Sequence, residues 1–250
     1  MKYVLITGGS SGIGFSLAKK FASDGYGLIL VSSNQEKLTR AKEQLQSSYN
    51  VSVLSFAMNL AQRGAAESLY EAVRNAGIEV SVLINNAGIG VLGATEQIPI
   101  KKDEELLELN MITPVTLTKL FLADMYRVGK GRILNVCSTG AFQPGPYTAT
   151  YYASKSFLLS YTKAVRYEAK EKGVIICALC PGTTDTGFFE RADGVTPKGA
   201  MSSDKVADYA YKQFMRGKEV IIPGLSYRLM KLFPERLKMI AVALVKKPRK

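Results

Sequence analysis

Tyr151 and Lys155 form the pair of residues in this sequence that is best suited to acid–base chemistry. In a helix, residues four apart lie on one face, one turn from each other. A phenol has an ordinary pKa of about 10, and a neighbouring ammonium group favours its ionised form, so we expect Lys155 to lower the pKa of Tyr151. The pair therefore predicts a group that exchanges a proton near neutral pH.

A serine upstream distinguishes this pair from similar patterns elsewhere in the chain. Tyr-x-x-x-Lys occurs three times, and the other two copies begin at Tyr126 and Tyr227. Only Tyr151 has a serine, Ser138, thirteen residues before it and at the end of an expected strand. The combination and its spacing, rather than the tyrosine and lysine alone, indicate a candidate catalytic segment.

Histidine is absent from the chain, which excludes Ser–His–Asp hydrolases, His-based proton shuttles and most zinc sites. Cys177 and Cys180 form a Cys-x-x-Cys, but residues 174–180 read as a buried strand, on which positions three apart point to opposite faces. We interpret both, with Cys137, as buried structural thiols and expect no metal site. An odd number of cysteines and no signal peptide favour the reducing cytoplasm.

Apolar runs alternate with amphipathic stretches along nearly the whole chain. Most of the runs are continuous, which is typical of parallel strands buried on both faces. We expect strands at residues 3–7, 27–32, 51–56, 80–85, 132–137, 175–180 and 220–222. We expect helices at residues 13–23, 35–48, 65–75, 103–126, 152–170 and 204–215.

This alternation predicts the α/β class, with a single doubly wound Rossmann-type domain. Its seven-stranded, mostly parallel sheet would carry helices on both faces. Residues 1–222 would form the dinucleotide-binding and catalytic part, and residues 223–250 a C-terminal helical extension of the same domain. Two long connections, after Asn85 and after Cys180, leave the carboxyl edge of the sheet, where ligands bind in such folds.

A glycine-rich turn at residues 7–14 joins the first strand to the first helix. Gly8 permits the tight turn, Gly12 lets the backbone approach a pyrophosphate, and Gly14 lets the helix pack on the strand. The N–H groups at the helix N-terminus would face the phosphates. We predict a dinucleotide site made by Gly8, Ser10, Ser11, Gly12, Ile13 and Gly14.

The end of the second strand indicates which dinucleotide binds. An acid here would hold the ribose 2′-hydroxyl and repel a 2′-phosphate, but the chain has Ser33 and Asn34, with Lys37 close by. These residues favour NADP(H) over NAD(H). The alternative stays open that Ser33 and Asn34 serve only as turn and helix-cap residues.

Together these motifs resemble the short-chain dehydrogenase/reductase family, over residues 1 to about 222. The resemblance rests on Thr7–Gly14, Asn85-Asn86-Ala87-Gly88, Asn110, Ser138, Tyr151-Tyr152-Ala153-Ser154-Lys155 and Pro181-Gly182-Thr183-Thr184-Asp185-Thr186. It implies that Tyr151 is the general acid/base, and that Lys155 also bonds the nicotinamide ribose. Ser138 would bond the substrate oxygen, and Asn110 would hold a water that links Lys155 to solvent; the alternative for Asn110 is a polar residue at a helix kink.

The resemblance also implies further cofactor contacts, and one of them departs from the family pattern. The family usually has an aspartate for the adenine amino group where this chain has Asn59, whose amide oxygen can still accept that bond. The implied contacts are Asn59, Leu60, Asn86, Ala87, Gly88, Tyr151, Lys155, Pro181, Gly182, Thr184 and Thr186.

The C-terminal tail is strongly basic. Residues 221–250 hold eight Lys or Arg and one acid, so they carry seven of the twelve net positive charges, which argues against a nucleic-acid-binding domain. An apolar stretch at residues 239–245 is too short to span a membrane, and we expect two amphipathic helices broken at Pro234. Three roles stay open: packing on the domain or a partner subunit, a lid over a hydrophobic substrate channel, or attachment to an anionic membrane surface.

The resemblance implies an oxidoreductase that interconverts a ketone or aldehyde and an alcohol with NADP(H). We interpret it as a cytoplasmic reductase of a lipophilic carbonyl substrate, acting as a homodimer or homotetramer without nucleic acid and with peripheral membrane contact through its tail. The alternative is a non-catalytic NADP(H)-binding sensor or scaffold, and a sugar-nucleotide epimerase would need a larger C-terminal domain. Substrate choice is expected to depend on residues 90–98, 142–148 and 188–200, which include Phe188 and Phe189.

Overall fold

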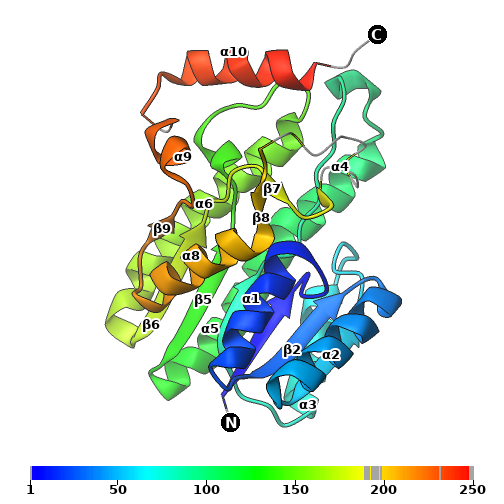
Figure 1. Cartoon of the computed structure of the whole chain (residues 1–250), viewed down its shortest axis with the longest axis vertical. Coiled ribbons are helices and arrows are strands. Elements are labelled where there is room, and N and C mark those ends of the chain that lie inside the picture. Colours follow the sequence, from blue (N-terminus) through cyan, green and yellow to red (C-terminus); the bar gives the residue numbers. More distant parts are fainter. Residues whose placement is uncertain (1, 189–191, 193–196, 198, 231, 248–250) are drawn as a thin grey trace.

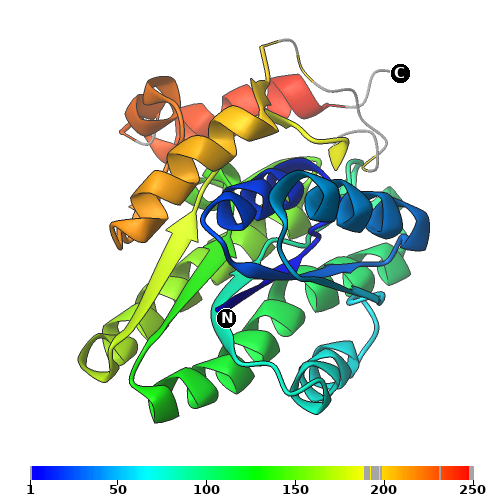
Figure 2. The ribbon, with the colours of Figure 1, turned by 60° about the horizontal axis from the view of Figure 1, so that its bottom comes forward.

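A computed structural model of the chain describes residues 2–188, 192, 197, 199–230 and 232–247. Seven strands form one sheet in the order β3-β2-β1-β4-β5-β6-β9, with helices on both faces (Figures 1 and 2). The strands are β1 (Tyr3–Thr7), β2 (Gly27–Ser32), β3 (Val53–Ala57), β4 (Val80–Asn85), β5 (Gly131–Val136), β6 (Val174–Leu179) and β9 (Val220–Ile221). The predicted Rossmann-type fold is confirmed, and every neighbouring pair in the sheet is parallel.

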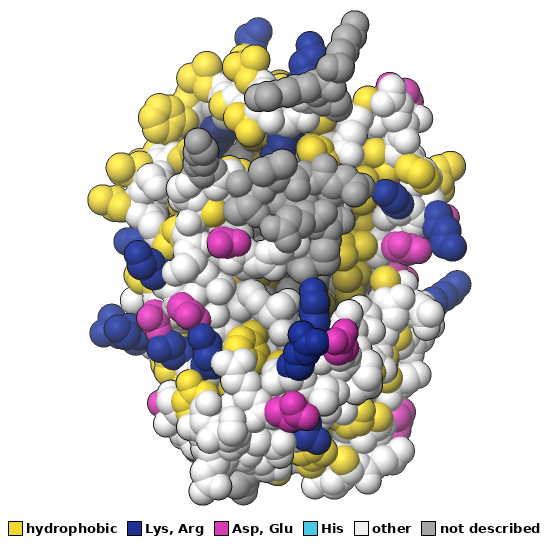
Figure 3. All heavy atoms as spheres, turned by 45° about the vertical axis from the view of Figure 1, so that its right-hand side comes forward, with side chains coloured by type: hydrophobic (Ala, Val, Ile, Leu, Met, Phe, Trp, Pro, Cys, Tyr) yellow, Lys and Arg dark blue, Asp and Glu magenta, His cyan; other side chains and the backbone are white. Residues whose placement is uncertain are grey.

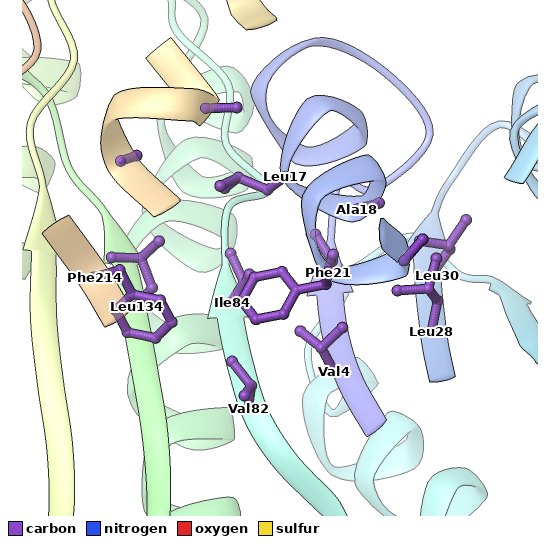
Figure 4. Close-up of a cluster of buried hydrophobic side chains, with 14 of the residues drawn as sticks. Val4, Leu17, Ala18, Phe21, Leu28, Leu30, Val82, Ile84, Leu134 and Phe214 are labelled. Carbon is purple, nitrogen blue, oxygen red and sulfur yellow. The ribbon is translucent and has the colours of Figure 1, made fainter. Parts of the chain in front are cut away.

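One face of the sheet is covered by α1 (Gly12–Ser23), α2 (Gln35–Tyr49) and α8 (Ser203–Met215). Their apolar side chains and those of the strands form one buried cluster. Phe21 of α1 and Phe214 of α8 lie in it edge to face over the strands, and both are fully buried (Figure 4). This cluster fixes α1, and with it the glycine-rich turn, against the sheet.

The opposite face is covered by α3 (Ala65–Asn75), α5 (Thr113–Val128) and α6 (Ala149–Ala169). Leu117 and Phe121 of α5 are buried there. The run Ile100–Val128 is long and apolar enough to cross a membrane by length and composition, but half of the apolar stretch is buried inside the protein. The core of the domain therefore accounts for its apolar character.

The three cysteines are buried, as predicted, and none of them forms a disulfide within the described part of the chain. Cys177 packs with the α1 and α8 side of the sheet, whereas Cys180 packs with Leu158 of α6. The two sulfur atoms thus lie on opposite faces, as the strand periodicity requires.

The helix expected at residues 103–126 is present, and it contains a π-helical turn that was not predicted. The segment consists of α4 (Ile100–Leu107), the π-helical turn η2 (Glu108–Ile112) and α5. A π turn adds one residue to a helical turn, and it shifts the faces of the flanking helices relative to each other. Asn110 lies in this turn.

Several short elements were not predicted. β7 (Thr184–Asp185) and β8 (Met201–Ser202) pair as a separate two-stranded sheet. The 3-10 turns are η1 (Thr95–Gln97), η3 (Thr139–Phe142) and η4 (Lys170–Lys172).

The tail forms α9 (Leu225–Met230) and α10 (Glu235–Lys246), and Pro234 immediately precedes α10. Figure 1 shows α10 across the end of the molecule opposite the N-terminus, beyond the carboxyl ends of the strands. Phe189 and the last three residues of the basic end lie outside the described residues.

Candidate active site

The site begins at the point where the order of the strands reverses. β1 pairs with β2 on one side and with β4 on the other, so the connections that follow β1 and β4 diverge. The hydroxyl oxygen of Thr7 accepts hydrogen bonds from the backbone N–H groups of Asn86 at 2.9 Å and Ala87 at 3.0 Å. These bonds fix the two connections to each other and leave a crevice at this edge of the sheet.

The glycine-rich turn has the geometry of a phosphate cradle. Gly8 and Gly12 have φ angles of 64° and 54°, in the left-handed region that favours glycine. A methyl group on Gly14 would lie 2.4 Å from the carbonyl oxygen of Gly8. The side chain of Ser11 does not cap α1, and the first turn of α1 holds no acid. The N-terminus of α1 therefore suits a pyrophosphate.

The end of β2 holds the residues expected to choose between the two dinucleotides. Ser10 donates to Ser32 at 2.8 Å, which joins the glycine-rich turn to this strand. The side chain of Asn34 accepts from the N–H of Lys37 at 2.8 Å and caps α2. The structural role considered for Asn34 is thus real, and its amide N–H groups are not used by the cap. Lys37 lines the same cavity.

Asn59 is held in a local turn, because its Oδ1 atom accepts from the backbone N–H of Ala61 at 3.1 Å. The residue still lines the cavity, as does Leu60. The amide oxygen can accept a second hydrogen bond through its other lone pair, so the predicted contact with an adenine amino group stays a prediction.

Tyr151 and Lys155 lie one turn apart on α6, with the Lys155 Nζ atom 5.9 Å from the centre of the Tyr151 ring. Lys155 is only 4% exposed, and its Nζ atom donates to the carbonyl oxygen of Val136 at 3.0 Å. Ser138 follows β5, and its hydroxyl accepts from the N–H of Gly140 at 3.0 Å and bonds the phenol of Tyr151. The hydroxyl groups of a serine and a tyrosine therefore meet beside a buried ammonium group.

Burial is the largest influence on the pKa values of Tyr151 and Lys155. Burial raises the pKa of Tyr151, and the contact that lowers it is the hydrogen bond with Ser138. Burial also lowers the pKa of Lys155. Desolvation thus dominates both groups, and the phenol is held in its protonated form at neutral pH.

Asn110 lies behind this group rather than on the cavity wall. Its side chain accepts from the N–H of Ile89 at 3.1 Å and donates to the carbonyl oxygen of Ile89 at 2.9 Å and to Ser154 at 3.2 Å. A methyl group on Gly88 would lie 3.1 Å from the Asn110 Oδ1 atom and 3.2 Å from the Lys155 Nζ atom. Asn110 therefore secures the loop after β4 against α6, and its predicted water-holding role stays a prediction.

One cavity of about 1870 Å³ joins the two halves of the site. Apart from Gly14, which packs behind the cradle, and Asn110, every residue predicted for the site lines it. The structure thus brings together Gly8, Ser10, Ser11, Gly12, Ile13, Ser33, Asn34, Asn59, Leu60, Asn86, Ala87, Gly88, Ser138, Tyr151, Lys155, Pro181, Gly182, Thr184 and Thr186.

Residues of the tail also line the cavity, although the sequence left the role of the tail open. Leu229 of α9 and Leu237, Ala241 and Val245 of α10 line the cavity. The Tyr227 hydroxyl accepts from the N–H of Thr183 at 3.1 Å, and so joins α9 to the loop after β6. The arrangement favours the lid among the three roles considered. The spacing of apolar residues in the tail predicts helices with an apolar face. It does not predict which part of the protein that face covers.

The sequence profile of the short chain dehydrogenase family matches residues 2–194. The uncharacterized oxidoreductase DltE of Bacillus subtilis (strain 168) is 32% identical over 225 residues, which cover 87% of this chain and 86% of that protein. The very-long-chain 3-oxoacyl-CoA reductase of Anas platyrhynchos is 29% identical over 185 residues, or 72% of this chain. This chain spans 58% of the length of that reductase.

A solved structure is similar over the whole chain. The short-chain dehydrogenase from Sphingobium yanoikuyae in complex with NADPH superposes with a TM-score of 0.86 at 28% identity. The match covers 100% of this chain and 97% of that one.

The cradle can be tested with Gly12→Ala. The new methyl group would lie 2.8 Å from the Cβ atom of Thr186, at a φ angle that L residues rarely adopt. We expect the Kd for NADPH, measured by fluorescence titration, to rise at least about tenfold, which corresponds to roughly 1.4 kcal/mol.

Gly25→Ala is the matched control, because Gly25 also has a positive φ of 78° but a methyl group there meets no atom within 4 Å. Both variants should lose about 1–2 kcal/mol of unfolding free energy, and only Gly12→Ala should lose cofactor affinity. Equal cofactor affinity in the two variants would show that the turn does not bind the dinucleotide.

Proposed function

The chain belongs to the short-chain dehydrogenase family of oxidoreductases, and on that premise we propose that it is an NADPH-dependent reductase that converts a lipophilic ketone or aldehyde into an alcohol. The observation that carries the proposal is the meeting of Ser138, Tyr151 and Lys155 in the cavity that also contains the glycine-rich cradle. A binding module without turnover has no need of that group.

Three side chains of the protein can stabilise and protonate the carbonyl oxygen of the substrate. The glycine-rich turn and the end of β2 would hold NADPH, which would supply the hydride for the carbonyl carbon. Ser138 donates a hydrogen bond to the oxygen, on which negative charge develops. The O–H bond of Tyr151 breaks as its proton passes to that oxygen, and Lys155 stabilises the phenolate that remains. The raised pKa of Tyr151 keeps its proton available at neutral pH until the oxygen becomes basic.

Preference for NADPH over NADH is supported at the end of β2. No acid lies at this edge among the described residues that line the cavity, and the side chains of Ser33, Asn34 and Lys37 line it. Each of them can meet a 2′-phosphate, Lys37 as a cation and the others as hydrogen-bond donors. The NADPH complex of the Sphingobium yanoikuyae enzyme is consistent with this choice.

A lipophilic substrate is supported by the walls of the cavity beyond Tyr151. The ring of Phe188 lies 5.3 Å from the ring of Tyr151, centre to centre. Met230, Phe233 and Val242 of the tail also line the cavity. The relative from Anas platyrhynchos is named as a reductase of very-long-chain acyl substrates, in agreement with an apolar cavity.

We also propose that the protein is a cytoplasmic homodimer or homotetramer. The three cysteines are reduced and buried, which suits a reducing compartment. Tyr167 of α6 is 84% exposed and Ile112 beside α5 is 51% exposed, so apolar surface is available for self-association.

Replacing Tyr151 by Phe tests the reductase proposal. We expect NADPH to bind with an unchanged Kd, because only the hydroxyl group is lost. Turnover on a panel of medium-chain ketones, 3-oxoacyl esters and steroid ketones should fall by at least about a thousandfold, which corresponds to roughly 4 kcal/mol of transition-state stabilisation. NADPH oxidation measured by absorbance gives the rate.

Tyr126→Phe is the matched control, since Tyr126 also starts a Tyr-x-x-x-Lys pattern but does not line the cavity. It should keep the wild-type rate. A wild-type protein that binds NADPH but reduces nothing on the panel would favour the sensor or scaffold alternative instead.

Lys37→Glu tests the choice of cofactor. Reversing this charge should raise the Kd for NADPH about tenfold at low salt and leave that for NADH within about twofold, because only NADPH carries the 2′-phosphate. The difference should shrink as salt is added. Lys42→Glu on the same helix α2 does not line the cavity and controls for net charge. Equal binding of NADPH and NADH by the wild type would refute the preference.

Contact with an anionic membrane surface is proposed for the outer side of α10. Ile240 and Leu244 are 46% and 77% exposed, and the surrounding segment is basic. Figure 3 shows hydrophobic side chains with Lys or Arg side chains beside them at the upper end of the molecule. The protein should sediment with vesicles that contain phosphatidylserine and not with pure phosphatidylcholine vesicles. Ile240→Glu/Leu244→Glu should abolish this binding; sedimentation unaffected by the double substitution would speak against this surface.

A further inference from the structure

Two buried polar side chains line the cavity without a hydrogen-bond partner. Gln143 is 9% exposed and Thr148 is 7% exposed, and both lie between Ser138 and Tyr151 in the sequence. Within the described part of the chain, neither the amide of Gln143 nor the hydroxyl of Thr148 forms a hydrogen bond. A buried polar group normally has a partner, because burial removes its hydrogen bonds to water.

Both groups open onto the cavity rather than into the packed core. Among the described residues, the buried side-chain atoms that are both unpaired and closed off from solvent belong to Asn85 and Asp103. The amide of Gln143 and the hydroxyl of Thr148 are unpaired but not closed off, and the space that both residues line is the cavity. A polar group of a ligand can therefore reach them from there.

Thr148 is placed by the turn that starts α6, less than one helical turn before Tyr151. A threonine at this position ordinarily caps the helix through its hydroxyl, but Thr148 makes no such bond. Tyr147 has a φ angle of 64°, which is costly for a bulky residue, and its carbonyl oxygen accepts from the N–H of Gly93 at 2.9 Å. The bond to the loop after β4 holds this turn, and the hydroxyl of Thr148 is left for a ligand.

Gln143 is placed by η3 and by its packing on α6. It directly follows η3, and Ser138 directly precedes that turn. The rise of about 2 Å per residue in a 3-10 turn puts Gln143 on the order of 10 Å from Ser138 along the chain. A methyl group on Gly145 would overlap the ring of Tyr152, so the segment after Gln143 lies directly against α6. The amide thus lies a few bond lengths from the place where the carbonyl oxygen of a substrate would bind.

We propose that Gln143 and Thr148 form a substrate subsite that binds a second, uncharged oxygen, a few bonds from the carbonyl group that is reduced. An amide and a hydroxyl each donate and accept, which suits a hydroxyl, ketone or ester oxygen. Neither side chain carries a charge that would offset the desolvation of an anion. The inference rests on the proposed reductase function and narrows its substrate class to lipophilic ketones or aldehydes that carry such an oxygen.

A structural role is the alternative, in which an ordered water occupies the subsite and bonds both side chains. That role does not distinguish a substrate with the second oxygen from one without it. A site built to bond an oxygen does distinguish them, because its polar groups stay unpaired when the oxygen is missing. The two roles are therefore separable with pairs of substrates that differ in this oxygen.

The test compares ketones that carry a hydroxyl or methyl ester group, at increasing distance from the ketone, with analogues in which an alkyl group replaces it. For the wild type we expect kcat/KM at the best spacing to be at least about tenfold above that of the analogue, as one hydrogen bond in a buried site would give. This ratio should fall in Gln143→Met and in Thr148→Val, and approach one in the double variant. Thr148→Ser retains the hydroxyl and should retain the ratio.

Gln213→Met is the matched control, because Gln213 on α8 is partly buried but does not line the cavity. It should keep the wild-type ratio. A ratio that survives in the double variant, or that is lost equally in the control, would overturn the assignment. So would a double variant whose Kd for NADPH rises as much as the ratio falls, because the pair would then serve the cofactor.

Binding without turnover separates this inference from the proposed function. Long-chain alcohols do not react with NADPH, so the NADPH-bound protein can be titrated by calorimetry with diols of the same range of spacings and with the matching mono-alcohols. The best diol should bind more tightly than its mono-alcohol, and the double variant should lose the difference. This pattern without reduction of any ketone would refute the proposed function alone. Equal binding of diols and mono-alcohols, with reduction intact, would refute the subsite alone.

Discussion

The buried ammonium group of Lys155 is the interaction on which the arrangement of the site depends. A charge removed from water is tolerated only where hydrogen bonds replace its hydration. Lys155 is 4% exposed, and the carbonyl oxygen of Val136 accepts from it at the end of β5. Gly88, in the loop after β4, has no side chain, and a methyl group there would lie only 3.2 Å from the Lys155 Nζ atom. Three neighbouring elements must therefore keep their spacing for one lysine to stay both buried and bonded.

A second, fully buried polar chain holds α6 at that spacing. Asn85 donates to Asn135 at 2.9 Å, and Asn135 donates to Thr162 at 2.9 Å, which connects β4 and β5 to the middle of α6. Polar groups in an apolar core are costly unless they are paired, so they permit only one register between helix and sheet. The register that satisfies Asn135 also directs Tyr151 and Lys155, further along α6, towards the cavity.

The sequence was sufficient to predict the sheet, its helices and the residues that gather at its carboxyl edge. Buried parallel strands, the glycine-rich turn and the spacing from Ser138 to Lys155 can each be recognised from residues close together in the sequence. It did not reveal the π turn at Asn110, since one extra residue in a helical turn hardly alters an apolar pattern of period 3.6. It did not show that burial raises the pKa of Tyr151, because burial depends on contacts that are distant in sequence. The place of α10 was undecided for the same reason.

The positive charge of the cavity relates the catalytic group to the cofactor site and to the tail. The described residues that line the cavity include lysines and no carboxylate, which favours a positive potential in that space. An anionic dinucleotide at one end offsets part of it. The helices α9 and α10 contain no fully buried residue, so little apolar packing fixes them. The Tyr227 hydroxyl accepts from the N–H of Thr183, and the Lys238 Nζ atom donates to the carbonyl oxygen of Phe142. The loops after β6 and β5, which border the catalytic group, therefore also position the tail.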